Sequence, residues 1–405
     1  MAPSFVSLGM VVLDELRFPH APTLHDVPGG SGAYSTLGAR LVAGRDRSHE
    51  IGCVVLAGDD FPETTLAQFE SWGMDLLVSR KPGRQSTRGL LVYEDSVFGP
   101  PSDLAPSSLL GSSAFHLLAS PDLAQEQIQQ LLKLRESSHI KHHPLLVWEP
   151  LPGSCKPDMR EQQLAAAKLV DVFSPNHLEF QALFEDSKSI SGDSTLDRKL
   201  LEQYAETFLD GGIGPDSRGA IIVRAGGDGC LVSSNSIHGR HKWLPAFYDN
   251  QFTIVDATGA GNTFLGALAF AMSACGKDVV QASALASVAA SFSLQQIGLP
   301  SLSSSRDSES QEQWNGDTFI RRCGVYENQI HNFTEQAMKQ SPRIALEHQI
   351  DPMKSRRSGM REMKMLNSRQ SIPPMAIRRG HPTPYLHSRN RKRSSRHITG
   401  TCQPT

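Results

Sequence analysis

Short apolar runs alternate with longer segments of helical spacing along the first three quarters of the chain. We interpret the apolar runs as buried strands, because they are brief and end at polar or glycine-rich turns. The predicted strands cover residues 5–13, 51–57, 114–118, 145–148, 170–173, 220–223 and 230–233. The predicted helices cover residues 33–42, 123–134, 161–168, 200–209 and 279–294. This alternation predicts an α/β fold with a mainly parallel central sheet covered by helices on both faces.

Residues 254–272 combine a short apolar run, a glycine-rich turn and a second apolar segment that is long enough for a helix. They predict a strand, a tight loop and a helix in that order. Such a loop directs backbone N–H groups into one concavity, toward which the positive end of the helix dipole also points. The segment therefore predicts a phosphate site. The alternative is a glycine turn that only allows the helix to pack closely.

The residues from Asp256 to Asn262, DATGAGN, resemble the D-T-x-G-A-G-D signature of the pfkB, or ribokinase-like, carbohydrate kinases. In that family the loop N–H groups form an anion hole, which the resemblance assigns to Gly259, Ala260 and Gly261. The last Asp of the signature is the catalytic base. This chain carries Asn262 there, and an amide cannot remove a proton from a hydroxyl group at neutral pH.

A second similarity lies near the N-terminus, where Gly29 and Gly30 precede the predicted helix 33–42. It resembles the N-terminal pfkB signature, and it implies that Asp14 and the glycine pair bind a sugar. The family's sugar-contacting Asn falls on Tyr34, so the resemblance implies an altered substrate site. A carboxylate at the end of a strand can also act only as a cap, which is the alternative for Asp14.

The segment 174–179 resembles the family's P-N-x-x-E motif, whose Asn and Glu hold water, metal and phosphate. The resemblance implies that Asn176 and Glu179 hold Mg²⁺ indirectly, through water. Amide and carboxylate oxygens suit this ion, which keeps much of its water. The alternative is a strand end followed by a helix with an Asn cap and an acidic first turn. Glu149 follows another strand, where the family usually has Asp.

The turn after the strand 220–223 resembles the family's T-x-G-x-x-G nucleotide-binding element, with Arg224 in place of Thr. It implies that Arg224, Gly226 and Gly229 bind ATP, although a glycine-rich hairpin turn is the alternative. The resemblance further implies that Asp256 has a structural role or lies near a bound monovalent cation. It also implies a small β-lid, which the segments 16–18 and 89–93 would supply.

Composition places the chain among globular proteins, with 39% hydrophobic and 20% charged residues. No run approaches the ~18 apolar residues of a membrane span, so we expect no membrane partner. The six cysteines are far apart and form no CxxC pair. This usage favours a reducing compartment, and we expect a cytoplasmic protein.

The net charge of −2 hides a basic C-terminal segment. Residues 339–405 contain 15 Lys and Arg against 3 Asp and Glu, whereas residues 1–338 contain 25 against 39. With few aromatic residues and no periodicity, this tail is expected to be disordered. Its charges are suited to weak, non-specific contacts with nucleic acid or to a nuclear signal. We predict a pfkB-like domain at 1–338, with its core at about 5–299, and a separate tail at 339–405.

Two functions are consistent with these residues. The first is phosphoryl transfer from ATP with Mg²⁺ to a hydroxyl group of a sugar or nucleoside, slowed by the loss of the base at Asn262. The second is a pseudokinase that binds a nucleotide or sugar and acts through a protein partner. The motifs together look most like the fungal pfkB-like group associated with maintenance of a double-stranded RNA killer virus.

Overall fold

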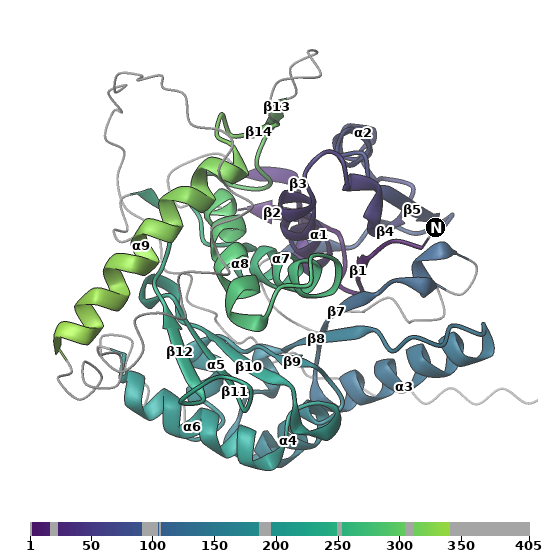
Figure 1. The fold of residues 1–405 in the computed structure, drawn as a ribbon. Coiled ribbons are helices and arrows are strands. Elements are labelled where there is room, and N and C mark those ends of the chain that lie inside the picture. The colour runs from purple at the N-terminus through teal and green to yellow at the C-terminus, as the bar shows by residue number, and fades with distance from the viewer. Residues whose placement is uncertain are drawn as a thin grey trace, which may run out of the picture. The chain divides into compact units, whose positions relative to one another are not determined.

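A sheet of nine strands, counted within the described residues, forms the centre of the N-terminal part of the chain (Figure 1). The computed structural model describes residues 2–16, 23–90, 104, 107–185, 196–248, 253–303 and 312–340. In spatial order the strands are β12 (His241–Leu244), β11 (Cys230–Ser234), β10 (Ala220–Arg224), β9 (Val172–Phe173), β8 (Leu145–Pro150), β7 (Ala114–Ala119), β1 (Phe5–Ser7), β4 (Ile51–Ala57) and β5 (Asp75–Arg80). Neighbours run parallel except at the two pairs that involve β11.

Helices cover both faces of this sheet (Figure 1). One face carries α1 (Gly30–Ala43), α2 (Glu63–Ser71), α7 (Ala260–Ala274) and α8 (Val279–Ser293), and the other carries α3 (Pro121–Ser137), α4 (Arg160–Ala167), α5 (His177–Gln181) and α6 (Arg198–Gly211). Successive strand residues supply the two hydrophobic cores, because side chains alternate across a sheet. In β8, Val147 joins the core under α1 and α7, whereas Trp148 joins the core under α3. The predicted α/β fold is confirmed.

The helices α1 and α7 approach each other very closely. A methyl group at Gly38 would lie 1.8 Å from the carbonyl oxygen of Thr263, and one at Gly266 would lie 1.7 Å from that of Ser35. Only glycine fits at such distances, because a Cβ atom would overlap the opposite backbone. This contact places the start of α7 beside the start of α1, where two of the predicted site segments lie.

A separate three-stranded sheet forms the expected lid. It consists of β3 (Leu24–Gly29), β2 (Val12–Leu16) and β6 (Arg88–Leu90), with β2 in the middle. The lid segments predicted at 16–18 and 89–93 are found in part, at Leu16 and at residues 89 and 90. The remaining residues of these two segments lie outside the described residues. The strand β3 was not predicted, because its sequence LHDVPG forms no apolar run and contains a proline.

Two predicted strands are wrong. The run 5–13 is divided between β1 and β2, which belong to different sheets. The chain turns at Gly9, where a side chain would collide with Ser31. The apolar run before the glycine loop at 254–256 is not a strand. Val255 instead donates its N–H to the carbonyl of Leu294, at the end of α8, so this segment does not pair with a strand of the sheet.

The C-terminal described segments add elements that apolar periodicity did not reveal. The strands β13 (Leu302–Ser303) and β14 (Gln313–Trp314) form a small antiparallel pair, and α9 (Phe319–Gln340) packs on α8. Arg322 and Tyr326 anchor α9, through bonds to the hydroxyl of Ser291 and the carbonyl of Pro245. The chain divides into the units Met1–Pro352 and Met353–Thr405, and the second unit lies outside the described residues. The domain boundary at 338 stays a prediction, and α9 ends at Gln340.

Candidate functional site

The glycine loop forms the N-terminus of α7. Gly259 adopts the left-handed conformation (φ 78°), which favours glycine, and α7 begins at Ala260. The N–H of Ala260 donates to the carbonyl of Ala257, and Gly259 accepts from Thr263. Within the described residues, the N–H groups of Gly261 and Asn262 donate to no protein acceptor. Two adjacent unpaired donors at the positive end of a helix form a site for an anion.

The carboxylate of Asp256 holds this loop in place. Its Oδ1 accepts the N–H of Thr258 at 2.9 Å, which closes the turn that leads into α7. Asp256 therefore has a structural role here, as the family resemblance allowed. A monovalent cation beside it stays a prediction.

Tyr34 lies directly against the loop. It belongs to α1 and is only 3% exposed. A methyl group at Gly259 would come 2.2 Å from Cγ of its ring. Burial, together with the charges of Asp256 and Asp14, raises the pKa of the Tyr34 hydroxyl above its usual value, so it keeps its proton. The ring thus fills space beside the loop at a position where the family has a sugar-contacting Asn.

Asp14 lies in β2 of the lid, between the backbones of two glycines. A methyl group at Gly29 or at Gly89 would lie 1.9 Å from one of its carboxylate oxygens. Burial, and secondarily the charge of Asp256, raise the pKa of Asp14 to about 6. Asp14 is therefore not a cap at a strand end. The charges of Asp14 and Asp256 both act on Tyr34, and the binding of a substrate by Asp14 stays a prediction.

Gly30 has a conformational role. Its φ is +84°, and a side chain there would meet the carbonyl of Met10 at 2.5 Å. It allows β3 to turn directly into α1, which carries Tyr34. A contact of Gly29 or Gly30 with a substrate stays a prediction.

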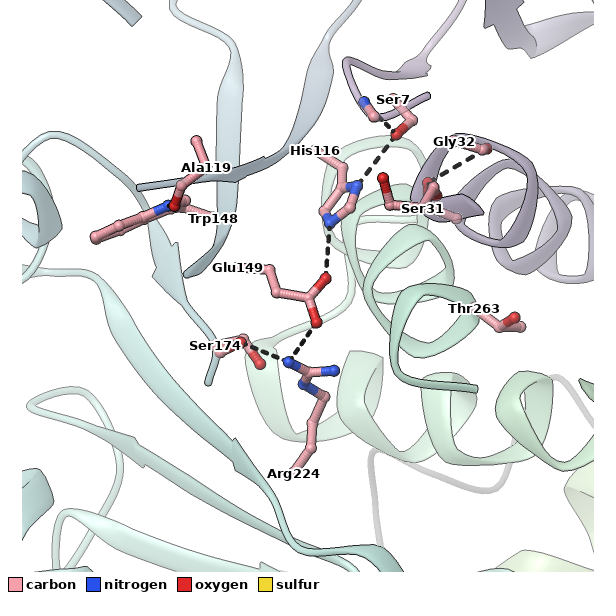
Figure 2. A network of polar contacts seen from close by, with 12 residues as sticks. Ser7, Ser31, Gly32, His116, Ala119, Trp148, Glu149, Ser174, Arg224 and Thr263 are labelled. Atoms are coloured by element: carbon pink, nitrogen blue, oxygen red, sulfur yellow. Dashed lines mark hydrogen bonds and ion pairs between the residues drawn. The ribbon is translucent and has the colours of Figure 1, made fainter. Parts of the chain in front are cut away.

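A row of polar side chains crosses four parallel strands, at the last residue of β1 and of β10, near the end of β8 and in the middle of β7 (Figure 2). Ser7 Oγ lies 3.1 Å from His116 Nδ1, and His116 Nε2 lies 3.7 Å from Glu149 Oε2. Glu149 Oε1 lies 2.6 Å from Arg224 Nη2, which also donates to the carbonyl of Ser174 at 3.0 Å. Ligands of parallel sheets bind at such strand ends. The row therefore extends from β1 to β10 along the edge where the loop lies.

The row ends at residues 259–262, which we call the anion loop. A methyl group at Gly261 would lie 2.0 Å from Nη1 of Arg224 and 3.9 Å from Oε1 of Glu149. The missing side chain of Gly261 thus makes room for the guanidinium group. Burial alone would raise the pKa of Glu149, but the charge of Arg224 and the contact with His116 hold it below its usual value. Glu149 is therefore an anion paired with Arg224.

Asn176 and Glu179 form a capping box on α5. The side chain of Asn176 accepts the N–H of Glu179 at 2.9 Å, and the side chain of Glu179 accepts the N–H of Asn176 at 2.8 Å. Burial raises the pKa of Glu179 to about 7, although Arg224, 3.9 Å away, opposes this shift. In the structure these side chains thus cap the helix α5, as the alternative interpretation stated. Their role in holding a metal through water stays a prediction.

Gly226 and Gly229 shape the hairpin between β10 and β11. Both have positive φ, and a side chain at Gly229 would collide with the carbonyl of Leu244 on the neighbouring strand. Nothing lies within 4 Å of a methyl group built on Gly226. The hairpin alternative therefore describes this turn, and a contact of either glycine with a nucleotide stays a prediction.

Comparison with known proteins identifies the family. Residues 9–305 match the pfkB family of carbohydrate kinases. The chain belongs to the pfkB family. An uncharacterized protein of Schizosaccharomyces pombe is 29% identical over 364 residues, covering 83% of this chain and 96% of the relative. The protein MAK32 of Saccharomyces cerevisiae is 29% identical over 349 residues, covering 80% and 92%. These matches confirm the expected likeness to a fungal group within the family.

The structural comparison agrees on the fold. The structure of ribokinase from Giardia lamblia has a TM-score of 0.52 and 17% sequence identity, and the match covers 74% of this chain and 94% of that protein. At this identity the likeness shows the fold alone. The ribokinase-like fold is therefore confirmed. In addition, none of the helices that the structure describes is long and apolar enough to cross a membrane.

The residues of this pfkB site fit a phosphate better than they fit a divalent metal ion. The free N–H groups of Gly261 and Asn262 and the nearby guanidinium suit an anion. Among the acidic side chains that could hold Mg²⁺, Glu179 caps α5, and Glu149 pairs with Arg224 through Oε1 while its Oε2 is buried without a hydrogen bond. No group of three or more His, Cys, Asp or Glu side chains within the described residues is arranged for a metal.

Two residues of the row were missed by the sequence analysis. His116 is fully buried within β7, and Ser7 ends β1. The only signal for His116 was a single polar residue inside the apolar run AFHLLA. Such a residue is more often a satisfied core side chain. Its link to Glu149 depends on the parallel pairing of β7 with β8, which apolar periodicity does not reveal.

Proposed function

We propose that this protein binds a nucleotide through its phosphates at the loop 259–262 and acts as a pfkB-fold pseudokinase. The observation that carries the proposal is the pair of unpaired N–H groups at Gly261 and Asn262 beside the guanidinium of Arg224. An anion there accepts hydrogen bonds from the backbone and gains the charge of Arg224. The side chain at the family's base position is an amide, which supports binding without efficient transfer.

The neighbouring pocket supports the same proposal. Tyr34 is buried against Gly259, on the side where the lid residue Asp14 lies. An aromatic ring at this position takes volume that a sugar would need. A nucleoside or a small sugar remains the proposed second ligand. A protein partner would then respond to the state of the site.

A slow kinase is the second candidate, and Asp14 is the observation that favours it. A carboxylate with a pKa of about 6 accepts a proton readily near neutral pH. In this reaction the acceptor hydroxyl oxygen bonds to the γ-phosphorus of ATP, the bond to the bridging oxygen breaks and ADP leaves. The hydroxyl proton passes to Asp14. Loss of an ideally placed base slows such a step by about 10²–10⁴, which leaves activity that can be measured.

Calorimetric titration with ATP, followed by assays of ADP release with sugars and nucleosides, separates these two candidates. We expect ATP to bind without turnover above that of the solution alone. Turnover that Asp14→Asn removes, with ATP binding retained, would replace the pseudokinase by the slow kinase. Absence of ATP binding by the folded protein would contradict both.

The cellular site and the basic tail remain predictions. Residues 339 and 340 belong to α9, and residues 341–405 lie outside the described residues. The expected cytoplasmic location, the nuclear signal and the weak contact of the tail with nucleic acid are therefore proposals based on composition alone.

A further inference from the structure

The guanidinium group of Arg224 lies between two carboxylates and the anion loop. Its Nη2 is 2.6 Å from Glu149 Oε1 and 3.9 Å from Glu179 Oε2. Its Nη1 is directed at the loop, 2.0 Å from where a methyl group of Gly261 would be. A fixed positive charge therefore stands beside the free N–H groups of the loop.

Most of the hydrogen-bonding capacity of Arg224 is unused. Nε is buried without a partner, and Nη1 makes no hydrogen bond with the described part of the chain. Oδ1 of Asn262, on the loop itself, is also buried without a partner, but it is an acceptor and requires a donor such as a ligand hydroxyl group rather than an anion. Buried polar groups normally have partners, since an unpaired one is costly. An anion that accepts from the N–H groups of Gly261 and Asn262 would also offer an acceptor to Nη1.

We propose that Arg224 is the resident cation of this site, and that binding of a phosphate at Gly261 and Asn262 requires no divalent metal ion. The inference rests on the proposed nucleotide binding and specifies how the phosphate charge is balanced. Arg224 is always charged and presents a planar fork that matches phosphate oxygens.

The acidic side chains beside the loop support this assignment. Glu149 and Glu179 are both near Arg224, which balances the charge of Glu149, its partner at 2.6 Å. A divalent ion at these carboxylates would have to approach the guanidinium, and like charges repel. Glu179 would also have to leave the capping box of α5 to bind the ion directly. Arg224 therefore supplies the positive charge beside the loop.

Calorimetric titration of the full-length protein with ATP, in excess EDTA and in excess Mg²⁺, tests the proposal. We expect binding under both conditions, with Kd values within about threefold of each other. Binding that occurs only with Mg²⁺ would overturn the inference and leave the proposed nucleotide site intact. Absence of binding under both conditions would contradict the proposed function and, with it, this inference.

The variant Arg224→Thr, which carries the family's residue, tests the role of the side chain. In EDTA its affinity for ATP should fall by roughly 10–100-fold, because hydrogen bonds to a charged group are lost. Arg80→Thr is the matched control, since Arg80 also ends a strand and pairs with a glutamate, but on the exposed surface. Unchanged affinity of folded Arg224→Thr would overturn the proposal.

Substitution of Glu149 should change ATP affinity in the opposite direction to substitution of Arg224. Removal of Arg224 leaves Glu149 buried without its partner and can unfold the protein, so the double variant Arg224→Thr/Glu149→Gln is measured as well. It should be folded and should bind ATP as weakly in EDTA as Arg224→Thr. Glu149→Gln alone removes a negative charge beside the loop and retains Arg224, so ATP affinity in EDTA should rise. A fall in affinity at unchanged Tm would overturn the proposal, because Glu149 would then be needed for binding instead of opposing it.

Discussion

The ring of Tyr34 and the backbone of Gly259 are in direct contact, so that a methyl group at Gly259 would come within 2.4 Å of three ring carbons. This contact joins the start of α1 to the anion loop before α7. It also explains why a buried tyrosine is compatible with the fold, because glycine is the only residue that leaves room for the ring. The ring of Tyr34 therefore covers the loop at Gly259, on the side of the lid.

Tyr34→Asn should open space beside the loop at a cost in stability. Loss of a buried ring destabilises a protein by about 3–5 kcal/mol, and a remaining polar group adds to this cost. We expect a lower free energy of unfolding, measured in denaturant, and new binding of at least one sugar, measured by calorimetry. Tyr34→Phe is the control, since it retains the ring and should bind no sugar. A Tyr34→Asn variant that is folded yet binds no sugar would indicate that Tyr34 does not occupy a sugar pocket.

Gly261→Val should abolish binding of ATP while the protein stays folded. The new side chain would occupy the place of Arg224 Nη1 and would narrow the approach to the free N–H groups. Calorimetry should show a loss of more than about tenfold in affinity. Gly227→Val is the matched control, because nothing lies within 4 Å of a methyl group at Gly227 and its φ is not positive. Equal ATP affinity in the two variants would contradict the anion-loop assignment.

Asn262→Asp should raise phosphotransferase activity toward a sugar or nucleoside hydroxyl. A restored carboxylate provides a base, which contributes about 10²–10⁴ in rate when it is well placed. A carboxylate is also favourable at the N-terminus of a helix. ADP release with a panel of acceptors measures the gain, and Asn262→Ala, which has no base, should show none. A lack of gain with all acceptors, at intact ATP binding, would support a remodelled pocket and the pseudokinase.

Stability should depend on pH through Asp14. Because burial and Asp256 raise the pKa of Asp14 from 3.8 to about 6, the folded state holds its proton more tightly than the unfolded state. The free energy of unfolding should therefore fall as pH rises from about 4 to 6. Asp14→Asn cannot ionise, so the fall between pH 4.5 and 7 should be smaller by roughly 1–3 kcal/mol.

Asp60→Asn is the control of opposite sign for this pH dependence. Hydrogen bonds from the backbone N–H of Ser86 and from the side chain of Arg88 hold the pKa of Asp60 below its usual range, so its stabilisation is lost as pH falls. Urea unfolding at about pH 7, 4.5 and 2.5 measures the differences, because the contribution of Asp14 changes between the first two values and that of Asp60 changes below its ordinary pKa of 3.8. If Asp14→Asn showed the same pH dependence as the natural protein, Asp14 would not be the buried carboxylate described here.

Removal of residues 339–405 should leave Tm and ATP binding unchanged. The anchors of α9 that the structure describes, Arg322 and Tyr326, lie in its first half and are retained in the shortened chain. Thermal unfolding and calorimetry of the truncated protein provide the test. A clear fall in Tm would mean that the tail packs on the domain, and the predicted boundary at 338 would then be wrong.

The sequence by itself determined the layered fold and the position of the anion loop. Apolar runs such as 51–57 and 114–118 are buried on both faces of a parallel sheet, so their composition alone marks them as strands. The helix after Gly259 follows from an apolar segment that begins at a glycine turn. These features follow from short stretches of sequence, because the apolar pattern and the turn residues that specify them are neighbours in the chain.

Only the tertiary structure decided what surrounds the loop. Gly259 and Tyr34 are 225 positions apart in the chain, as the sequence numbering shows. They meet only because α1 and α7 pack so closely that glycine is required at their contact. His116, Glu149 and Arg224 come from three different strands and form a row only through the parallel order of β7, β8, β9 and β10. Motif spacing identified Asn176 and Glu179, but their hydrogen bonds to each other's backbone show the helix cap they form. Such relationships depend on strand order and close packing between distant segments, which the pattern along one chain does not contain.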